Sequence, residues 1–230
     1  MDYEVPSELT IDEIKNIIED YGTAAANAMR AGFDGVELHA SLGYLPNQFL
    51  TESSNQRTDQ YGGTIENRSR FILEVMEGLI TAVGAEKVDI KLSPSVPINN
   101  MSDSNIGESY TYLIHLLNAL PIAYIHLMQP LFPMDDLPEY LKDPLDYFGH
   151  LIKKPIITNG GYVRETAEKI LAENKAQFVS FGSLFIANPD LPQRFELNAN
   201  LNEVDRQTMY GGDDIGYIDY PVLVSESING

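Results

Sequence analysis

A histidine and a tyrosine, His39 and Tyr44, are the first side chains in the sequence whose types and spacing suit acid–base chemistry. His39 follows an apolar run that predicts a β-strand over residues 33–38, and Tyr44 lies in the loop after it. Parallel α/β barrels place their catalytic groups at this end of their strands. The alternative is a hydrogen-bonded strand-end histidine beside a half-buried tyrosine ring, and the spacing alone favours that structural interpretation.

The elements that must position this pair are helices and strands in alternation. Predicted helices cover about residues 11–31, 64–83, 105–120, 145–152, 164–174 and 189–197, and predicted strands cover 33–38, 88–92, 123–128, 155–158 and 178–181. Such alternation predicts a parallel sheet covered by helices. A doubly wound Rossmann-like sheet is the rival, but no predicted strand is followed by a GxGxxG sequence. No linker-like change of composition divides the chain, so we expect a single domain over residues 1–230.

The composition of the chain argues against several classes of partner and ligand. The chain has 230 residues, 43% of them apolar, and a net charge of −19, which argues against nucleic acid and against an anionic membrane as partners. It contains no cysteine, and its four histidines show no metal-ligand spacing, so we expect neither disulfides nor a metal site. The first residues lack the basic and apolar regions of a signal peptide, which favours a cytoplasmic protein.

Several short motifs follow one another from His39 to Arg68. They are HASLGYL at residues 39–45, QFL at 48–50, NQRTDQYGG at 55–63 and ENR at 66–68. In this order and spacing they resemble the Old Yellow Enzyme family of FMN-dependent NAD(P)H oxidoreductases, many of which reduce activated alkenes. The resemblance continues through NGGY at 159–162, FGS at 181–183 and NPDL at 188–191 to GYIDYP at 216–221.

The resemblance implies a (β/α)8 TIM-barrel type of α/β fold. The five predicted strands correspond to the later part of that barrel, so we expect an incomplete barrel of about five β/α units, with the first three strands missing. On this interpretation Met1 marks a truncation, the start of a gene fragment or an artificial boundary. The strands at 33–38 and 178–181 would then be open edges, which predicts self-association or a partner chain that completes the barrel.

The resemblance also implies roles for individual residues. His39 would hydrogen-bond the carbonyl that activates the substrate, and Tyr44 would donate the proton to the substrate's α-carbon. FMN would be held by Lys91, Gly160, Gly161, Gly182, Ser183 and Tyr210. NAD(P)H would be the reductant, and the substrate a small electron-poor alkene or enone.

Three positions depart from the family pattern. Leu42 stands where a second carbonyl donor, Asn or His, is usual, and loss of one such donor can cost about 10²–10³-fold in rate. Lys91 replaces an arginine beside the flavin and keeps the charge without the planar fork. Ser183 replaces the arginine of the phosphate site. We therefore expect an ene-reductase with weak activity, and the alternative is an inactive barrel remnant, or a structural or interaction protein, with weak or no flavin binding.

Overall fold

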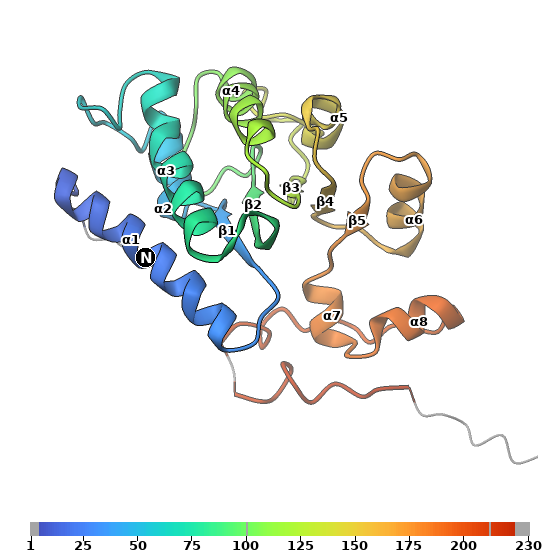
Figure 1. The fold of residues 1–230 in the computed structure, drawn as a ribbon. Helices are drawn as coiled ribbons and strands as arrows, with labels where there is room; N and C mark the ends of the chain where they lie inside the picture. Colours follow the sequence, from blue (N-terminus) through green and yellow to red (C-terminus); the bar gives the residue numbers. More distant parts are fainter. Residues whose placement is uncertain (1–4, 100, 212, 224–230) are drawn as a thin grey trace, which may run out of the picture.

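The computed structural model describes residues 5–99, 101–211 and 213–223, and at its centre lies a sheet of five parallel strands (Figure 1). The strands are β1 (Val36–Ala40), β2 (Val88–Leu92), β3 (Ile125–Met128), β4 (Ile156–Asn159) and β5 (Phe178–Val179). They lie side by side in the order of the chain, without the reversal that defines a doubly wound sheet. The Rossmann-like alternative is therefore excluded, and the predicted parallel α/β arrangement is confirmed.

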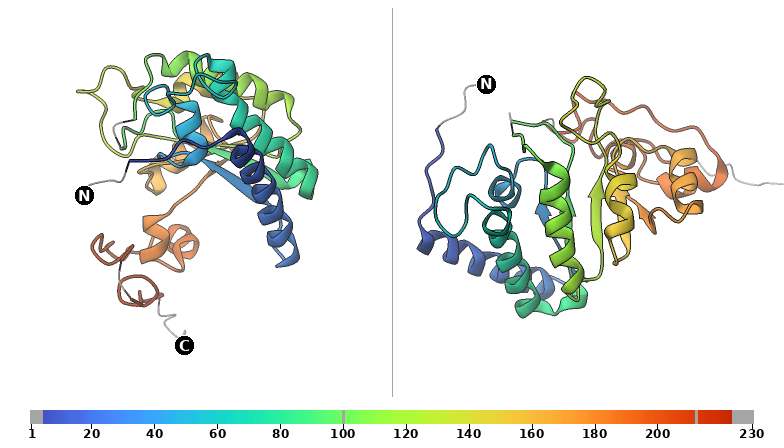
Figure 2. Two further views of the ribbon diagram at one scale, coloured as in Figure 1. Left: turned by 90° about the vertical axis from the view of Figure 1, so that its left-hand side faces the viewer. Right: turned by 90° about the horizontal axis from the view of Figure 1, so that it is seen from above.

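The described residues form eight helices, most of which cover the outer side of the strands. They are α1 (Ile11–Arg30), α2 (Leu45–Leu50), α3 (Ile65–Val83), α4 (Ile106–Ala119), α5 (Pro144–Phe148), α6 (Arg164–Ala172), α7 (Ser183–Ala187) and α8 (Leu191–Leu197), with 3-10 turns η1 (Ala85–Lys87) and η2 (Gly149–Leu151). In Figure 1 the strands form an arc, and the helices from α1 to α6 follow one another around its convex side. The turned views in Figure 2 show the same one-sided cover, with α7, α8 and the segment after them on the open side.

The first long helix, α1, has a local start signal and packs on the core. The Thr10 hydroxyl accepts the Glu13 backbone N–H, and the Glu13 carboxylate accepts the Thr10 N–H, so the two residues form a capping box at the start of α1. Inward of this helix, Phe71 of α3 is fully buried and stacks on Phe49 of α2 with ring centroids 4.2 Å apart. The main core thus lies between the sheet and the helices on its convex side.

The two faces of the sheet differ in chemistry. Along β1, Leu38 and Ala40 are buried under the helices, while Glu37 and His39 alternate with them and face the open side. The same alternation gives β2 a buried apolar side and a polar side that carries Asp89 and Lys91. The open side of the sheet is therefore lined by titratable groups at its β1 and β2 end.

Several predicted boundaries were wrong. β1 begins at Val36, three residues later than predicted, because residues 33–35 lead away from α1 before pairing with β2 begins at Val88. His39 therefore lies within the strand. β5 has two paired residues in place of four, and the short helices α2 and α7 were not predicted, because elements this short carry too few residues to show a period.

None of the helices in the described part of the chain combines the length and the apolar character needed to cross a bilayer.

Candidate active site

The turn after β1 places the histidine and the tyrosine together. The Tyr44 backbone N–H donates to the Ser41 carbonyl across a distance of 3.2 Å, which closes a four-residue turn. Its central residues, Leu42 and Gly43, have φ values of 55° and 78°, the combination found in type I′ turns. Leu42 is held there by a hydrogen bond of 2.9 Å from its N–H to the Ser93 hydroxyl, beyond the end of β2. A leucine seldom adopts this left-handed conformation, so long-range contacts impose it.

The rings of His39 and Tyr44 lie 4.8 Å apart between centroids at an angle of 54°. The Tyr44 side chain is 60% exposed, and its hydroxyl has no hydrogen-bond partner among the described residues. The His39 Nδ1 lies 3.1 Å from the Ser41 hydroxyl, while Nε2 has no partner in the described part of the chain. The two predicted catalytic residues thus meet, and each has a hydrogen-bonding atom available for a ligand.

Lys91 lies opposite His39 in the β1–β2 register and is half-buried. Burial lowers the pKa of Lys91, and the charge of Glu37 opposes this effect. Burial also lowers the pKa of His39, and the charge of Lys91 lowers it further. A neutral imidazole and an ammonium group are therefore neighbours at the carboxyl end of two paired strands.

A loop that contains Gly160 and Gly161 follows the carboxyl end of β4. Their φ values are 111° and 72°, and a Cβ on Gly160 would lie 2.7 Å from the Gln129 carbonyl oxygen, so only glycine fits there. Neither glycine N–H makes a hydrogen bond to any residue that the structure describes. The buried amide oxygens of Gln129 and Asn159 beside this loop also lack a partner there. Such unsatisfied polar groups mark a place where a polar ligand could bind.

Gly182, Ser183 and Tyr210 complete the predicted set. Gly182 is exposed after β5, and a Cβ on it would meet only open space, so packing does not explain the glycine. Ser183 is the first residue of α7. Tyr210 lies on the segment after α8 with its side chain 81% exposed, and in the described residues no hydrogen bond or ring contact joins it to the other site residues. Its predicted place beside the flavin stays a prediction.

A polar network continues along the open face of the sheet from the His39–Lys91 pair. The His126 ring bridges β1 and the end of β5, with Nδ1 2.9 Å from the Glu37 carboxylate and Nε2 3.1 Å from the Ser180 hydroxyl. Burial acts to raise the pKa of Glu37, but hydrogen bonding and charge interaction with His126 outweigh it and lower that pKa. Burial raises the pKa of Asp89 to about 6 despite a hydrogen bond from the Tyr124 N–H, and the Glu37 charge adds to the rise.

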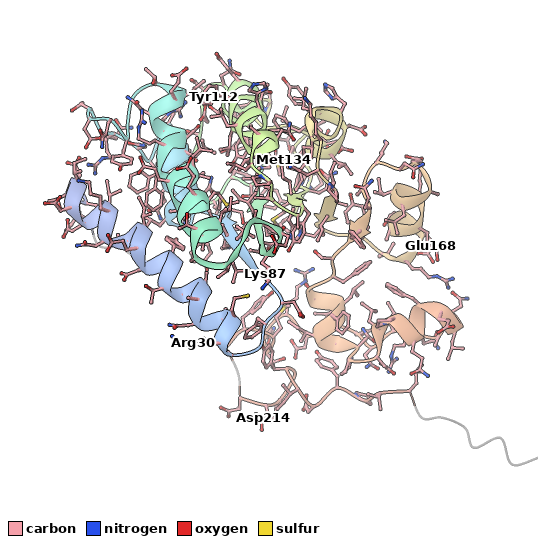
Figure 3. The ribbon with its side chains drawn as sticks, viewed as in Figure 1. Arg30, Lys87, Tyr112, Met134, Glu168 and Asp214 are labelled. Carbon is pink, nitrogen blue, oxygen red and sulfur yellow. The ribbon has the colours of Figure 1, made fainter. Side chains whose placement is uncertain are left out.

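Two arginines of the motif-rich loop have structural roles. Arg68 is buried and donates to the Leu50 carbonyl and to the Asp103 carboxylate, and Arg57 pairs with Asp59. Figure 3 shows that side chains fill the space between the helices and the sheet. These contacts tie the loop to the rest of the barrel segment.

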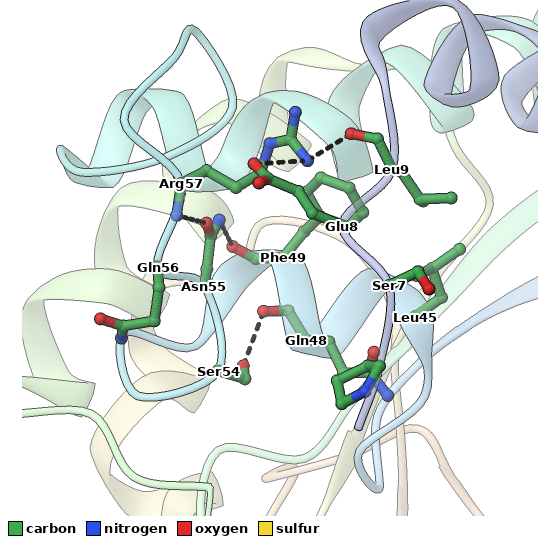
Figure 4. A pocket seen from close by; sticks show the side chains of 11 residues that line it. Ser7, Glu8, Leu9, Leu45, Gln48, Phe49, Ser54, Asn55, Gln56 and Arg57 are labelled. Atoms are coloured by element: carbon green, nitrogen blue, oxygen red, sulfur yellow. Dashed lines mark hydrogen bonds and ion pairs between the residues drawn. The ribbon is translucent and has the colours of Figure 1, made fainter. Parts of the chain in front are cut away.

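A separate pocket of about 350 Å³ lies between the segment before α1, helix α2 and the loop that carries Arg57 (Figure 4). Arg57 closes one side of it and donates to the Leu9 carbonyl at 2.7 Å. None of the predicted site residues lines this pocket. Among the described residues, no His, Asp and Glu side chains gather in a group that could hold a metal ion.

Two residues of the site were missed by the sequence reasoning. Ser41 and Ser93 hold the His39 ring and the Leu42 backbone, respectively. Residues two apart on a strand share a face, which could have indicated Ser41, but the predicted strand ended at residue 38 whereas β1 extends to Ala40. No local signal pointed to Ser93, since its partner lies 51 residues away.

Comparisons with known proteins agree on one family. Residues 1–202 match the model of the NADH:flavin oxidoreductase / NADH oxidase family. The chain is 43% identical to putative 12-oxophytodienoate reductase 5 of Oryza sativa subsp. japonica over 99% of its length and 61% of the relative. It is 44% identical to 12-oxophytodienoate reductase 1 of the same organism over 97% of its length and 59% of that relative. Among solved structures, morphinone reductase in complex with tetrahydroNAD matches with a TM-score of 0.87 and 44% identity, over 96% of this chain and 59% of that one. The chain thus spans about 60% of the length of these relatives.

The raised pKa of Asp89 predicts a pH-dependent stability difference. The folded state holds the Asp89 proton up to about pH 6, whereas the unfolded state loses it near 3.8. The stabilisation from the protonated carboxyl is therefore complete below the unfolded pKa and is lost as the pH rises through the folded one. Asp89→Asn keeps an acceptor for the Tyr124 N–H without a charge, so it should gain about 1–3 kcal/mol over the wild type between about pH 4 and pH 7.5.

Urea unfolding of both proteins at these two pH values measures this gain. Asp34→Asn removes an exposed carboxylate near β1 and serves as the control. An Asp89→Asn difference that is the same at both pH values would show that Asp89 titrates normally in the folded protein.

Proposed function

The chain belongs to the NADH:flavin oxidoreductase / NADH oxidase family, and from this premise we propose that it is an FMN-dependent, NAD(P)H-driven reductase of electron-poor C=C bonds. The observation that carries the proposal is the pairing of His39 with Tyr44 at the carboxyl end of β1, with Lys91 beside them on β2. Family membership confirms the Old Yellow Enzyme resemblance, and the incomplete barrel agrees with a match to about 60% of each relative. The proposal takes the 230 residues as one domain.

The residues present fit FMN. The free N–H groups of Gly160 and Gly161, and the open space at Gly182, suit the close approach of a phosphate to the backbone. Ser183 can add one hydrogen bond there. The ammonium of Lys91 favours negative charge on reduced flavin.

FMN, when bound, supplies the hydride that reaches one carbon of the alkene. The His39 Nε2–H would donate to the carbonyl oxygen that activates the alkene, which draws electron density away from the carbon that receives the hydride. The Tyr44 hydroxyl would donate the proton to the adjacent carbon, and its exposure allows it to recover a proton from solvent. Because Leu42 offers no side-chain hydrogen bond, the carbonyl would have a single side-chain donor from this turn.

The experiment that tests the proposal separates the two half-reactions. Purified protein is loaded with FMN, reduced by NAD(P)H, and then mixed with an enone such as cyclohexenone, while the flavin absorbance is followed. Tyr44→Phe should slow the enone step about 100-fold or more, because only that step needs its proton, and should leave flavin reduction nearly unchanged. Tyr217→Phe, at another exposed tyrosine, is the matched control.

Equal slowing of both half-reactions in Tyr44→Phe would remove Tyr44 from the acid role. Failure of the wild-type protein to bind any added FMN would leave the alternative, a barrel remnant without catalysis.

The left-handed turn gives a second prediction. Asn-Gly is the favoured pair at the centre of a type I′ turn, so Leu42→Asn should relieve backbone strain, by about 1 kcal/mol, and supply a second donor to the carbonyl. Leu42→Gly relieves the strain but supplies no donor, which makes it the matched control. We expect the enone step to become about tenfold faster in Leu42→Asn only. A similar gain in both variants would assign the effect to the backbone, and no gain in either would refute the donor argument.

The edges of the sheet give a third prediction. Among the described residues, β1 pairs only with β2, and β5 pairs only with β4. Phe178 in β5 is 60% exposed, and Phe33, three residues before β1, is 67% exposed. Unpaired edges next to exposed apolar rings template association, and a net charge of −19 does not satisfy their backbone groups. We propose that the 230-residue chain self-associates through these edges, or binds a partner chain there.

Size-exclusion chromatography with light scattering at micromolar concentration measures this association. Phe178→Lys should shift the distribution toward the monomer, and Leu131→Lys, at an exposed leucine in the loop after β3, is the control. A monodisperse 25.6 kDa species with a cooperative melt in the wild type would contradict the prediction.

A further inference from the structure

The hydroxyl group of Ser41 is buried directly beside the His39 ring. Ser41 is 0% exposed, and its Oγ lies 3.1 Å from the His39 Nδ1. This is the only hydrogen bond of that hydroxyl to any residue the structure describes. The Ser41 carbonyl also accepts the Tyr44 N–H, so the same residue anchors the turn that carries the tyrosine.

The need of each donor for an acceptor decides which of the two atoms donates in this hydrogen bond. Either the serine O–H donates to an unprotonated Nδ1, or a protonated Nδ1 donates to the serine oxygen. In the second arrangement the serine proton would have no acceptor at a site closed to water, and a buried donor without a partner is costly. The first arrangement satisfies the hydroxyl donor and leaves the proton of the neutral imidazole on Nε2.

We propose that Ser41 is a positioning residue that fixes His39 as the neutral tautomer protonated on Nε2, and so makes His39 the hydrogen-bond donor for a single carbonyl oxygen of the substrate. This inference rests on the proposed function for its consequence, but the tautomer itself does not depend on it. The other neutral tautomer, which is protonated on Nδ1, would direct the Nε2 lone pair at the carbonyl oxygen and repel it. Because Leu42 provides no second donor, the tautomer of one ring determines whether the turn can activate a carbonyl at all.

The groups around the ring favour the same neutral state. A protonated imidazolium would again direct Nδ1–H at the Ser41 oxygen and leave the serine proton without an acceptor. The charged and titratable groups that face His39 are Glu37 on its own strand, Lys91 on β2, His126 on β3 and Tyr44 in the turn. Burial and the Lys91 charge lower the pKa of His39 against the opposing Glu37 charge, which agrees with a neutral donor near neutral pH.

Nitrogen NMR of the protein labelled with ¹⁵N-histidine tests the tautomer without flavin or turnover. The chain has four histidines, and His39→Gln identifies the signals of His39. We expect the wild type to show a protonated Nε2 and an unprotonated, hydrogen-bonded Nδ1. Ser41→Ala should show a mixture of tautomers and a His39 titration moved to higher pH, whereas Ser41→Thr should restore the wild-type signals. Ser95→Ala removes another fully buried serine hydroxyl, which accepts the Leu141 N–H, and is the matched control.

A protonated Nδ1 in the wild type would overturn the proposal, as would unchanged His39 signals in Ser41→Ala. If Ser41→Ala does not fold, the wild-type spectrum still decides the tautomer. In flavin-loaded protein, Ser41→Ala should slow the enone step on the order of tenfold and leave flavin reduction unchanged. If His39 shows the expected tautomer but the flavin-loaded protein reduces no enone, the proposed function is refuted. The role of Ser41 in fixing the tautomer of the ring would still stand.

Discussion

The parallel register of β1 on β2 is the constraint on which the candidate site depends. It lays His39 opposite Lys91, and side chains opposite each other in a parallel pair point to the same face of the sheet. The ammonium of Lys91 therefore disfavours a second positive charge on the imidazole, in addition to the effect of burial. A shift of one residue in this register would turn His39 under the helices and replace it on the open face by Leu38 or Ala40.

The same register explains why the polar groups are gathered on one face. Strand residues alternate between the two faces, and the helices occupy only the convex one, so polar residues at every second position all reach the open side. Glu37 and His126 pair across this face, and the hydrogen bond from His126 to Ser180 extends the link to the end of the short edge strand. The bond compensates in part for a β5 ladder of only two residues.

Much of the fold could be predicted from the sequence because its signals are local. The Thr10 cap, the period of the long helices and the apolar runs of β2 and β3 each lie within a short window. The meeting of His39 and Tyr44 was predictable for the same reason, since both lie within one strand and its turn. The left-handed Leu42 was not, because a leucine gives no sign of positive φ and the contact with Ser93 that helps to impose it comes from a distant part of the chain. The exposed position of Tyr210 likewise depends on how the segment after α8 crosses the open side, which no local pattern describes.

The departures from the family pattern share one physical consequence. Under the proposed function, Leu42 and Ser183 stand where the family pattern has a side chain that recognises a ligand, so the contribution of the side chain is lost at Leu42 and reduced at Ser183. The turn places Tyr44 beside His39, and the backbone N–H groups of Gly160 and Gly161 make no hydrogen bond to any described residue. If the proposed function holds, recognition of a carbonyl oxygen or a phosphate in this chain would rest on backbone N–H groups and on a single imidazole, in place of paired side-chain donors. In such a site no second side-chain donor can compensate when the imidazole is misoriented. The Ser41 hydroxyl, which orients that imidazole, therefore has a larger effect than it would have in a site with two donors.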